Sequence, residues 1–294
     1  MKKVLMIVNP FAGKNQARNG LLDVIGVFNR ARYSVTVMTT QYRGHATIIA
    51  QSAKNWDLIV CLGGDGTLNE VISGLIKSGS SIPIGYIPAG STNDFANTLG
   101  LSKDPIRAAK DIIEGVPTGI DVGMFGDRYF TYVASFGAFT KASYATPQQI
   151  KRTLGHAAYV LEGMKELPEI RSQTLRISSP DGDFEGDYIW GAVANTTSVG
   201  GVITLAPDVV SLDDGRFELL LIKNPESVGE LNRCILSILS QDYECDMIDF
   251  VSTGAVTVTA DPQMDWTLDG EKESGRKNIE IKNLRQAVSL VMCK

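Results

Sequence analysis

The 294-residue sequence has little histidine and cysteine, which narrows the chemistry open to it. Its two histidines, His45 and His156, lie far apart and match no metal-binding motif. Its four cysteines form no Cys-x-x-Cys pair, and Cys61 stands inside an apolar run, so we expect reduced thiols and a cytoplasmic protein. The scarcity of histidine, together with the lack of a Gly-x-Ser-x-Gly segment, argues against a serine hydrolase.

Long apolar runs and basic stripes are also missing. No run approaches the ~20 apolar residues of a membrane-spanning helix, and the run Val4–Val8 is too short for a signal peptide. Any membrane contact is therefore expected from the surface, as a peripheral protein at the inner face. The net charge of −5 and the absence of a basic stripe argue against nucleic acid as a partner.

The first part of the chain alternates between strand and helix patterns. Continuous apolar runs at Val4–Val8, Leu58–Leu62 and Ile84–Ile87 are typical of strands buried on both faces. Helical periodicity occupies Gln16–Phe28 and Leu68–Lys77. This alternation predicts a doubly wound, Rossmann-like α/β domain, whose ligands bind at the carboxyl ends of the strands.

Strand patterns dominate after about Asp121. Phe184–Ala194 and Ala255–Thr259 are examples, and helical patterns occur among them at Leu154–Leu167 and Leu231–Leu239. This predicts a second domain that resembles a β-sandwich with inserted helices. We therefore expect one domain over residues 1–124 and another over residues 125–294.

Gly63-Gly64-Asp65-Gly66-Thr67 is the most informative segment, because it follows a buried strand and opens a helix. Glycines allow backbone N–H groups to approach a phosphate closely, and the helix N-terminus favours an anion. Asp65 could hold Mg²⁺ through water. The structural alternative is a Gly-Asp turn in which Thr67 caps the helix.

Two further polar loops follow predicted strands. Asn9–Lys14 comes after the first strand, and its lysine could neutralise phosphate charge. Pro88–Ala96 comes after the predicted strand Ile84–Ile87 and contains Ser91-Thr92-Asn93-Asp94. Taken singly, these segments are explained by a solvent-facing lysine and by helix capping. Their shared position at one edge of the sheet predicts a phosphate-binding crevice.

The three segments together resemble the nucleotide-binding signatures of the diacylglycerol kinase catalytic family, which includes sphingosine kinases, ceramide kinases and bacterial soluble lipid kinases. The Gly-Gly-Asp-Gly-Thr core is shared with NAD kinases and phosphofructokinases, whereas Asn-Pro-x-x-Gly-Lys and Asn-Asp-Phe-Ala favour the lipid kinases. The resemblance continues through most of the chain, at Asn195, Gly200-Gly201, Pro207, Asp214-Gly215 and Leu268-Asp269-Gly270-Glu271. In the family a third glycine usually follows the pair that corresponds to Gly200-Gly201, and Val202 takes its place here.

The resemblance implies an ATP site formed by Asn9, Pro10, Gly13, Lys14, Thr40, Gly64, Asp65, Gly66, Thr67, Leu68, Asn69 and Ser91, the last replacing a threonine of most relatives. It implies a network around a catalytic Mg²⁺ formed by Asp65, Asp94 and Asp121. It also implies a second, structural Mg²⁺ held by Asp214 and the backbone carbonyls of Ser211 and Arg216.

Asp269 is the residue we predict as general base, with Glu271 in support and Asp65 as a third catalytic residue. The structural alternative is strong locally, because Asp269-Gly270 is a common hairpin turn signal.

The expected function is transfer of the γ-phosphate of ATP to a lipid hydroxyl at a membrane surface, in a cleft between the two domains. Diacylglycerol is the expected acceptor, which gives phosphatidic acid, and relatives suggest a homodimer. Two alternatives stay open. An NAD kinase would act on a soluble ribose hydroxyl, and a catalytically inactive regulatory protein would bind nucleotide without transfer.

Overall fold

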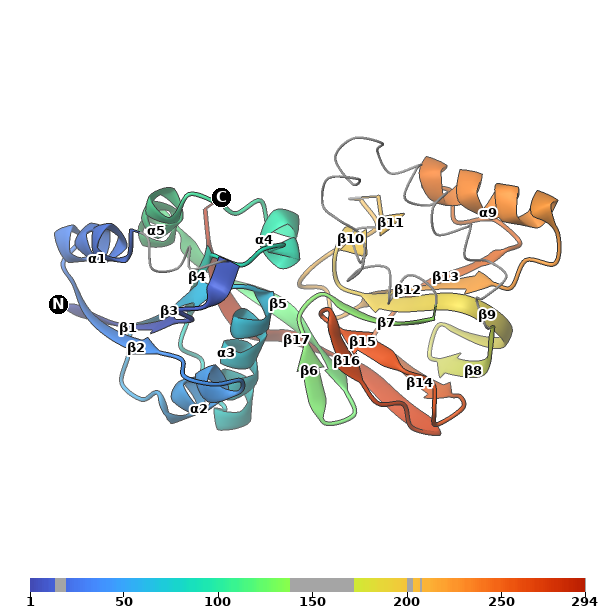
Figure 1. Ribbon diagram of the computed structural model, residues 1–294, viewed down its shortest axis with the longest axis horizontal. Coiled ribbons are helices and arrows are strands. Elements are labelled where there is room, and N and C mark those ends of the chain that lie inside the picture. Colours follow the sequence, from blue (N-terminus) through green and yellow to red (C-terminus); the bar gives the residue numbers. More distant parts are fainter. Residues whose placement is uncertain (14–19, 138–171, 200–202, 207, 294) are drawn as a thin grey trace. The chain divides into compact units, whose positions relative to one another are not determined.

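The computed structural model describes residues 1–13, 20–137, 172–199, 203–206 and 208–293. The chain forms two compact units (Figure 1). The first unit contains Met1–Asp121 and Gln286–Lys294, and the second contains Val122–Arg285. The sequence analysis predicted a division into residues 1–124 and 125–294. In the structure, the last residues of the chain belong to the first unit instead. The reason is that strand β17 (Asn278–Met292) pairs near its end with β4 (Ile84–Pro88), through Leu290 and Ile84.

The first unit is built on a parallel sheet whose strands β1 (Lys2–Val8), β3 (Leu58–Gly63) and β4 are largely buried. Strand β1 lies between β2 (Tyr33–Thr39) and β3 and pairs in parallel with both. Strand β3 pairs in parallel with β4. All four strands therefore end at the same edge, as the alternating sequence pattern predicts.

Helices cover both faces of this sheet (Figure 1). On one side α1 (Leu21–Arg30) contacts α5 (Pro105–Glu114), and on the other α2 (His45–Ser52) contacts α3 (Asp65–Ser78). Because side chains alternate along β1, Val4, Met6 and Val8 join the core beneath α1 and α5, and Leu5 and Ile7 are buried toward the other face. A short helix, α4 (Asp94–Thr98), follows β4.

Helix α5 was not part of the sequence prediction, although its start signal is clear. Asp104 is the N-cap, and its carboxylate accepts a hydrogen bond from the Arg107 N–H at 2.7 Å. Pro105 occupies the first turn, where its missing N–H costs nothing. The predicted helix Gln16–Phe28 is described from Leu21 onward, because residues 14–19 lie outside the described ranges.

The second unit is formed mainly from antiparallel strands, as predicted. Strand β9 (Gly182–Ala194) organises it, since its first half pairs with β8 (Gln173–Ser179) and its second half with β7 (Val133–Gly137) and β12 (Phe217–Lys223). Strands β5 (Val116–Phe125) and β17 each contribute residues to both units. The remaining elements of the second unit are β6 (Arg128–Phe130), β10 (Ser198–Val199), β11 (Ile203–Thr204), α9 (Val228–Ser240), β13 (Ile248–Thr253), β14 (Ala255–Thr259), β15 (Trp266–Leu268) and β16 (Glu271–Glu273).

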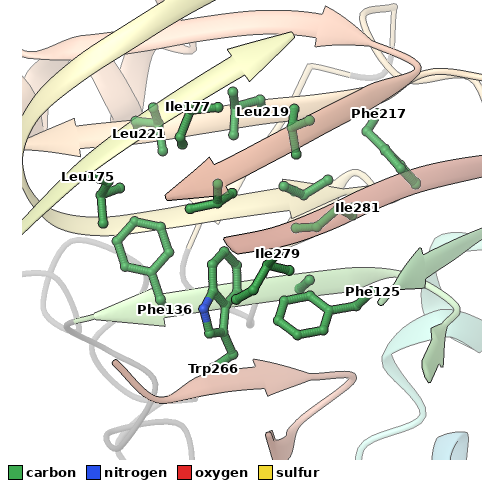
Figure 2. Close-up of a cluster of buried hydrophobic side chains, with 14 of the residues drawn as sticks. Phe125, Phe136, Leu175, Ile177, Phe217, Leu219, Leu221, Trp266, Ile279 and Ile281 are labelled. Atoms are coloured by element: carbon green, nitrogen blue, oxygen red, sulfur yellow. The ribbon is translucent and has the colours of Figure 1, made fainter. Parts of the chain in front are cut away.

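Large aromatic and aliphatic side chains fill the core of the second unit (Figure 2). Trp266 lies between Phe125 and Phe136, with ring centroids 5.0 and 5.1 Å from theirs. Leu219 and Leu221 of β12 point into the same cluster. Among the predicted helices of this unit, Leu231–Leu239 is found as α9, and Leu154–Leu167 lies outside the described residues. Within the described ranges, no helix is long and apolar enough to cross a membrane.

We predict that Leu219→Ala lowers the free energy of unfolding by about 2–5 kcal/mol, because it leaves a cavity in this core. Leu219 is 1% exposed, whereas Leu236 on α9 is 66% exposed, so Leu236→Ala is a matched control that should change it by less than about 0.5 kcal/mol. Urea unfolding followed by tryptophan fluorescence, to which Trp190 and Trp266 of this unit contribute, measures both. Equal effects of the two substitutions would contradict the assignment of Leu219 to the core.

Candidate functional site

Three polar loops of the first unit meet where β1, β3 and β4 end. The Asn9 N–H donates to the Leu62 carbonyl at 2.9 Å, and the Ala89 N–H donates to the Gly63 carbonyl at 2.7 Å. The Asn9 side-chain amide donates to the Thr67 hydroxyl at 3.0 Å. Backbone and side-chain contacts therefore join the loops after all three strands, which are the loops that the sequence analysis singled out.

Gly64 and Gly90 are where two of these loops touch. A Cβ atom built on Gly90 would lie 2.7 Å from the Gly64 Cα and 2.6 Å from the Asn93 Oδ1. Cβ atoms essentially never come within 3.0 Å of other heavy atoms that are not their chain neighbours, so a side chain at Gly90 would force the loops apart. Glycine is required here for close approach of two backbones.

The loop after β4 is held in shape by two side chains. Asn93 clamps Gly90, because its Oδ1 accepts the Gly90 N–H at 2.8 Å and its Nδ2 donates to the Gly90 carbonyl at 3.0 Å. The Asp65 carboxylate accepts the N–H groups of Asp94 at 3.1 Å and of Phe95 at 3.3 Å. Asp65, in the first turn of α3, thus fixes the start of α4.

The residues predicted for nucleotide binding do not all occupy equivalent positions. Gly64 is the N-cap of α3, so the alternative in which Thr67 caps this helix is wrong, and Thr67 instead accepts from Asn9. Leu68 is fully buried, and its N–H donates to the Gly64 carbonyl, which makes it a part of the helix. Ser91 is exposed, whereas Thr40 is buried beside β1.

The other predicted nucleotide-binding residues surround this edge. Asn9, Pro10 and Gly13 follow β1, while Gly66 and Asn69 lie in the first turns of α3. Lys14 lies outside the described residues, as do Gly200, Gly201, Val202 and Pro207 of the second unit.

Glu70 has a role that the sequence analysis did not assign. Its carboxylate accepts the N–H groups of Gly44 at 2.7 Å and of Ala46 at 3.1 Å. These groups lie at the N-terminus of α2, where a negative charge is favourable. Glu70 therefore ties the loop after β2 to α3, and with it the segment that follows Thr40.

Negative charge accumulates around the loops of the first unit. Burial raises the pKa of the Tyr86 hydroxyl, and the nearby carboxylates of Asp65 and Asp94 raise it further. The pKa of the Cys61 thiol is raised by burial and then by Glu70 and Asp65. Mg²⁺ prefers oxygen ligands and is usually bound by one or two carboxylates together with water and substrate phosphates. The carboxylates of Asp65 and Asp94 are suited to this kind of binding.

Asp121, the third predicted member of this network, is fully buried in the first unit. Its Oδ1 accepts the Gln286 N–H at 2.7 Å, which links β5 to β17. Among the residues that the structure describes, no three histidine, cysteine or acidic side chains form a direct metal cluster. A role for Asp121 beside Asp65 and Asp94 therefore stays a prediction, and it would act through water.

In the second unit, the Asp269 carboxylate is buried and accepts four hydrogen bonds from one loop. Oδ2 accepts the Thr131 N–H at 2.6 Å and the Thr131 hydroxyl at 2.7 Å. Oδ1 accepts the N–H groups of Tyr132 at 3.0 Å and Val133 at 3.1 Å. Since an ionised carboxylate offers about four acceptor positions, these donors occupy its usual capacity.

Asp269 also forms the turn between β15 and β16, as the structural alternative predicted. Leu268 pairs with Glu271, which leaves the two-residue loop Asp269-Gly270 with φ values of 47° and 83°. Two positive φ values are typical of a type I′ hairpin. Burial raises the pKa of the Asp269 carboxyl, and the hydrogen bonds from Thr131, Tyr132 and Val133 oppose that rise.

Glu271, the predicted support of Asp269, forms ion pairs on the hairpin. It pairs with Arg128 at 3.6 Å, and Arg128 also pairs with Glu273 at 2.7 Å.

The predicted second metal site lies in the turn before β12. Asp214 is exposed, and its Oδ1 accepts the Arg216 N–H at 2.9 Å, which closes this tight turn. The carboxylate and carbonyl oxygens of the turn are the type of ligand that Mg²⁺ prefers.

We predict that Gly90→Ala lowers the free energy of unfolding by about 1–3 kcal/mol, because its methyl group collides with Gly64 and Asn93. Hydrogen exchange at the Asp94 amide should also become faster, since the loop is displaced from Asp65. Gly229→Ala is the control, because a Cβ there lies 3.8 Å from its nearest atom. Unchanged stability and exchange in Gly90→Ala would refute the close approach.

We predict that Asp269→Asn lowers the free energy of unfolding by about 2–4 kcal/mol, because an amide N–H₂ then faces two buried donors of the Thr131–Val133 loop. Asp265→Asn is the matched control on the same hairpin arm. Its ion pair with Lys272 is exposed and contributes about 0–1 kcal/mol. Thermal and urea unfolding measure both, and equal stabilities would argue against the four-donor arrangement.

Comparison with known proteins covers the chain almost completely. Residues 3–125 match the family model described as "Diacylglycerol kinase catalytic domain", and residues 133–292 match "YegS C-terminal NAD kinase beta sandwich-like domain". The diacylglycerol kinase of Bacillus subtilis (strain 168) is 35% identical over 297 residues, covering 100% of this chain and 97% of the relative. That of Staphylococcus aureus (strain MRSA252) is 32% identical, covering 98% and 92%.

A solved structure has the same fold. It is the crystal structure of a diacylglycerol kinase from Bacillus anthracis str. Sterne, with a TM-score of 0.75 at 23% identity, covering 99% of this chain and 97% of that one. Identity to the curated relatives exceeds 30% over nearly the whole length, and the catalytic-domain model covers the loops described above. The chain therefore belongs to the diacylglycerol kinase family.

Proposed function

We propose that this chain is an ATP-dependent lipid kinase that transfers the γ-phosphate of ATP to the hydroxyl of diacylglycerol and so forms phosphatidic acid. The observation that carries the proposal is the meeting of three loops after β1, β3 and β4, held together by the Gly64–Gly90 approach and the Asp65 carboxylate. The names of the relatives support the choice of acceptor.

ATP binds at this edge of the first unit. The N-terminus of α3 faces the phosphates with its positive end, and Gly66 lets the backbone approach them. Ser91, Asn69 and the Asn9 loop contribute polar atoms around the nucleotide, and Lys14 adds a positive charge. Thr40 acts through its backbone, because its side chain is buried.

The Asp65 and Asp94 carboxylates would hold a Mg²⁺ ion beside the nucleotide, and Asp121 would contribute through water. When bound, the ion neutralises charge on the phosphate oxygens. Asp65 has two tasks in this proposal, since it also orders the Asp94–Phe95 backbone. Asp214 and the backbone carbonyls of Ser211 and Arg216 would hold a second, structural Mg²⁺.

Asp269 is the proposed general base, and its hydrogen bonds set a condition on how it acts. To take a proton from the acceptor hydroxyl, one of its four donors must leave an oxygen. The Thr131 hydroxyl is the donor that can do so, because rotation about its Cβ–Oγ bond moves the hydrogen, whereas a backbone N–H is fixed. Burial raises the pKa of the Asp269 carboxyl, which makes its carboxylate a stronger base.

The lipid acceptor enters from a membrane surface and presents its hydroxyl while its acyl chains stay with the bilayer. The reaction needs the nucleotide held by the first unit and the base of the second, with Glu271 supporting Asp269. The proposal includes a homodimer as the assembly.

We predict that labelled γ-phosphate from ATP with Mg²⁺ appears in phosphatidic acid when diacylglycerol is supplied in mixed micelles. Asp269→Asn should lower kcat about 100-fold or more, because proton transfer to a positioned base contributes 10²–10⁴-fold. Asp265→Asn on the same hairpin should keep full activity. Circular dichroism at the assay temperature separates loss of the base from loss of the fold.

Other acceptors in the same assay test the alternatives. Other lipid alcohols and free NAD are each supplied with the wild-type protein. Labelled NADP would replace the lipid-kinase proposal with an NAD kinase. Saturable ATP binding without a labelled product from any acceptor would favour an inactive nucleotide-binding protein.

A further inference from the structure

Strand β12 of the second unit contains a charged residue in an otherwise apolar and buried run. Its sequence from Phe217 to Ile222 is Phe-Glu-Leu-Leu-Leu-Ile, and Glu218 is only 1% exposed. Phe217 and Leu219 point into the core, so Glu218 faces the other side of the sheet, between Ala194 of β9 and Ser252 of β13. A buried glutamate is rare unless it is paired.

The hydrogen bonds of Glu218 do not explain its burial. Its Oε1 accepts a long hydrogen bond of 3.4 Å from the Ser252 hydroxyl. Its Oε2 is buried without a hydrogen-bond partner. Leaving a buried carboxylate oxygen unpaired costs free energy, and in native structures such an oxygen points to a water or an ion.

Arg216 lies close to Glu218 and yet does not satisfy it. Its Nε donates to the Ser252 hydroxyl at 3.2 Å, and its Nη2 donates to the Ser252 carbonyl and pairs with Asp181 at 2.9 Å. The guanidinium is thus directed at Ser252 and Asp181. Ser252 lies between the Arg216 guanidinium and Glu218, because its hydroxyl contacts both.

A second carboxylate, that of Asp214, belongs to the turn directly before this strand, four residues before Glu218. The bond from the Arg216 N–H to Asp214 closes the turn directly before β12. Asn283 is anchored on the same turn, since its Nδ2 donates to the Arg216 carbonyl at 2.8 Å, and its Oδ1 is buried without a partner.

We propose that Glu218 is a ligand of a divalent cation together with Asp214, and that the Asn283 Oδ1 is a neutral third ligand. This inference rests on the second metal site of the proposed function and extends it to two residues that the family motif did not supply. Two carboxylates and an amide oxygen are hard donors suited to Mg²⁺ or Ca²⁺. A cation would satisfy the unpaired buried oxygens of Glu218 and Asn283.

The inference can be tested without ATP or lipid, so its failure is separate from failure of the kinase proposal. Mn²⁺ serves as the probe, and its binding to the nucleotide-free protein is measured by electron paramagnetic resonance. We predict that Glu218→Gln, which keeps the shape and removes the charge, raises the Kd at least about tenfold. Asp214→Asn should do the same. Glu185→Gln, on an exposed strand position, should leave the Kd unchanged.

Thermal unfolding provides a second readout. Mn²⁺ should raise the Tm of the wild type and of Glu185→Gln, and it should raise that of Glu218→Gln much less. If Glu218→Gln does not fold, Glu218→Asp replaces it, because its shorter carboxylate should also weaken Mn²⁺ binding at least about tenfold. Wild-type affinity in either Glu218 variant, or no Mn²⁺ binding by the wild type, would overturn the assignment.

Discussion

A carboxylate that accepts backbone N–H groups of a distant loop is the interaction on which both sites of this protein depend. Asp65 holds the Asp94–Phe95 backbone, Glu70 holds the start of α2, and Asp269 holds the Thr131–Val133 segment. Hydrogen bonds to a charged acceptor are shorter and stronger than neutral ones. Each such carboxylate therefore holds the segment at which another element begins: α4, α2 or β7.

This way of fixing loops has a chemical consequence, because an oxygen used for structure is not available for chemistry. Asp269 uses its full capacity on one loop, so its proposed role as a base depends on the one donor that can rotate, the Thr131 hydroxyl. Glu218 is the opposite case, since one of its oxygens is buried and unused. The tasks that we propose for the two residues differ accordingly: proton transfer for Asp269, and cation binding for Glu218.

Much of the fold and part of the candidate site could be predicted because the signals are local. The apolar run Val4–Val8 and the Gly63–Thr67 segment carry their strand and loop structure in consecutive residues. Glu218 also had a local signal, a charge inside the apolar run Phe217–Ile222, which was not used. The pairing of Thr131 with Asp269 had none, because the two residues are 138 positions apart.

The sequence by itself determined the kinds of elements, their order and the loops with phosphate-binding chemistry. These follow from side-chain periodicity and from the backbone freedom of glycine, which act over a few residues. Only the tertiary structure decided that Gly64 and Gly90 touch, that β17 ends beside β4, and which carboxylates are saturated. Such contacts join segments far apart in the chain, and they depend on strand order and on burial, which no local pattern specifies.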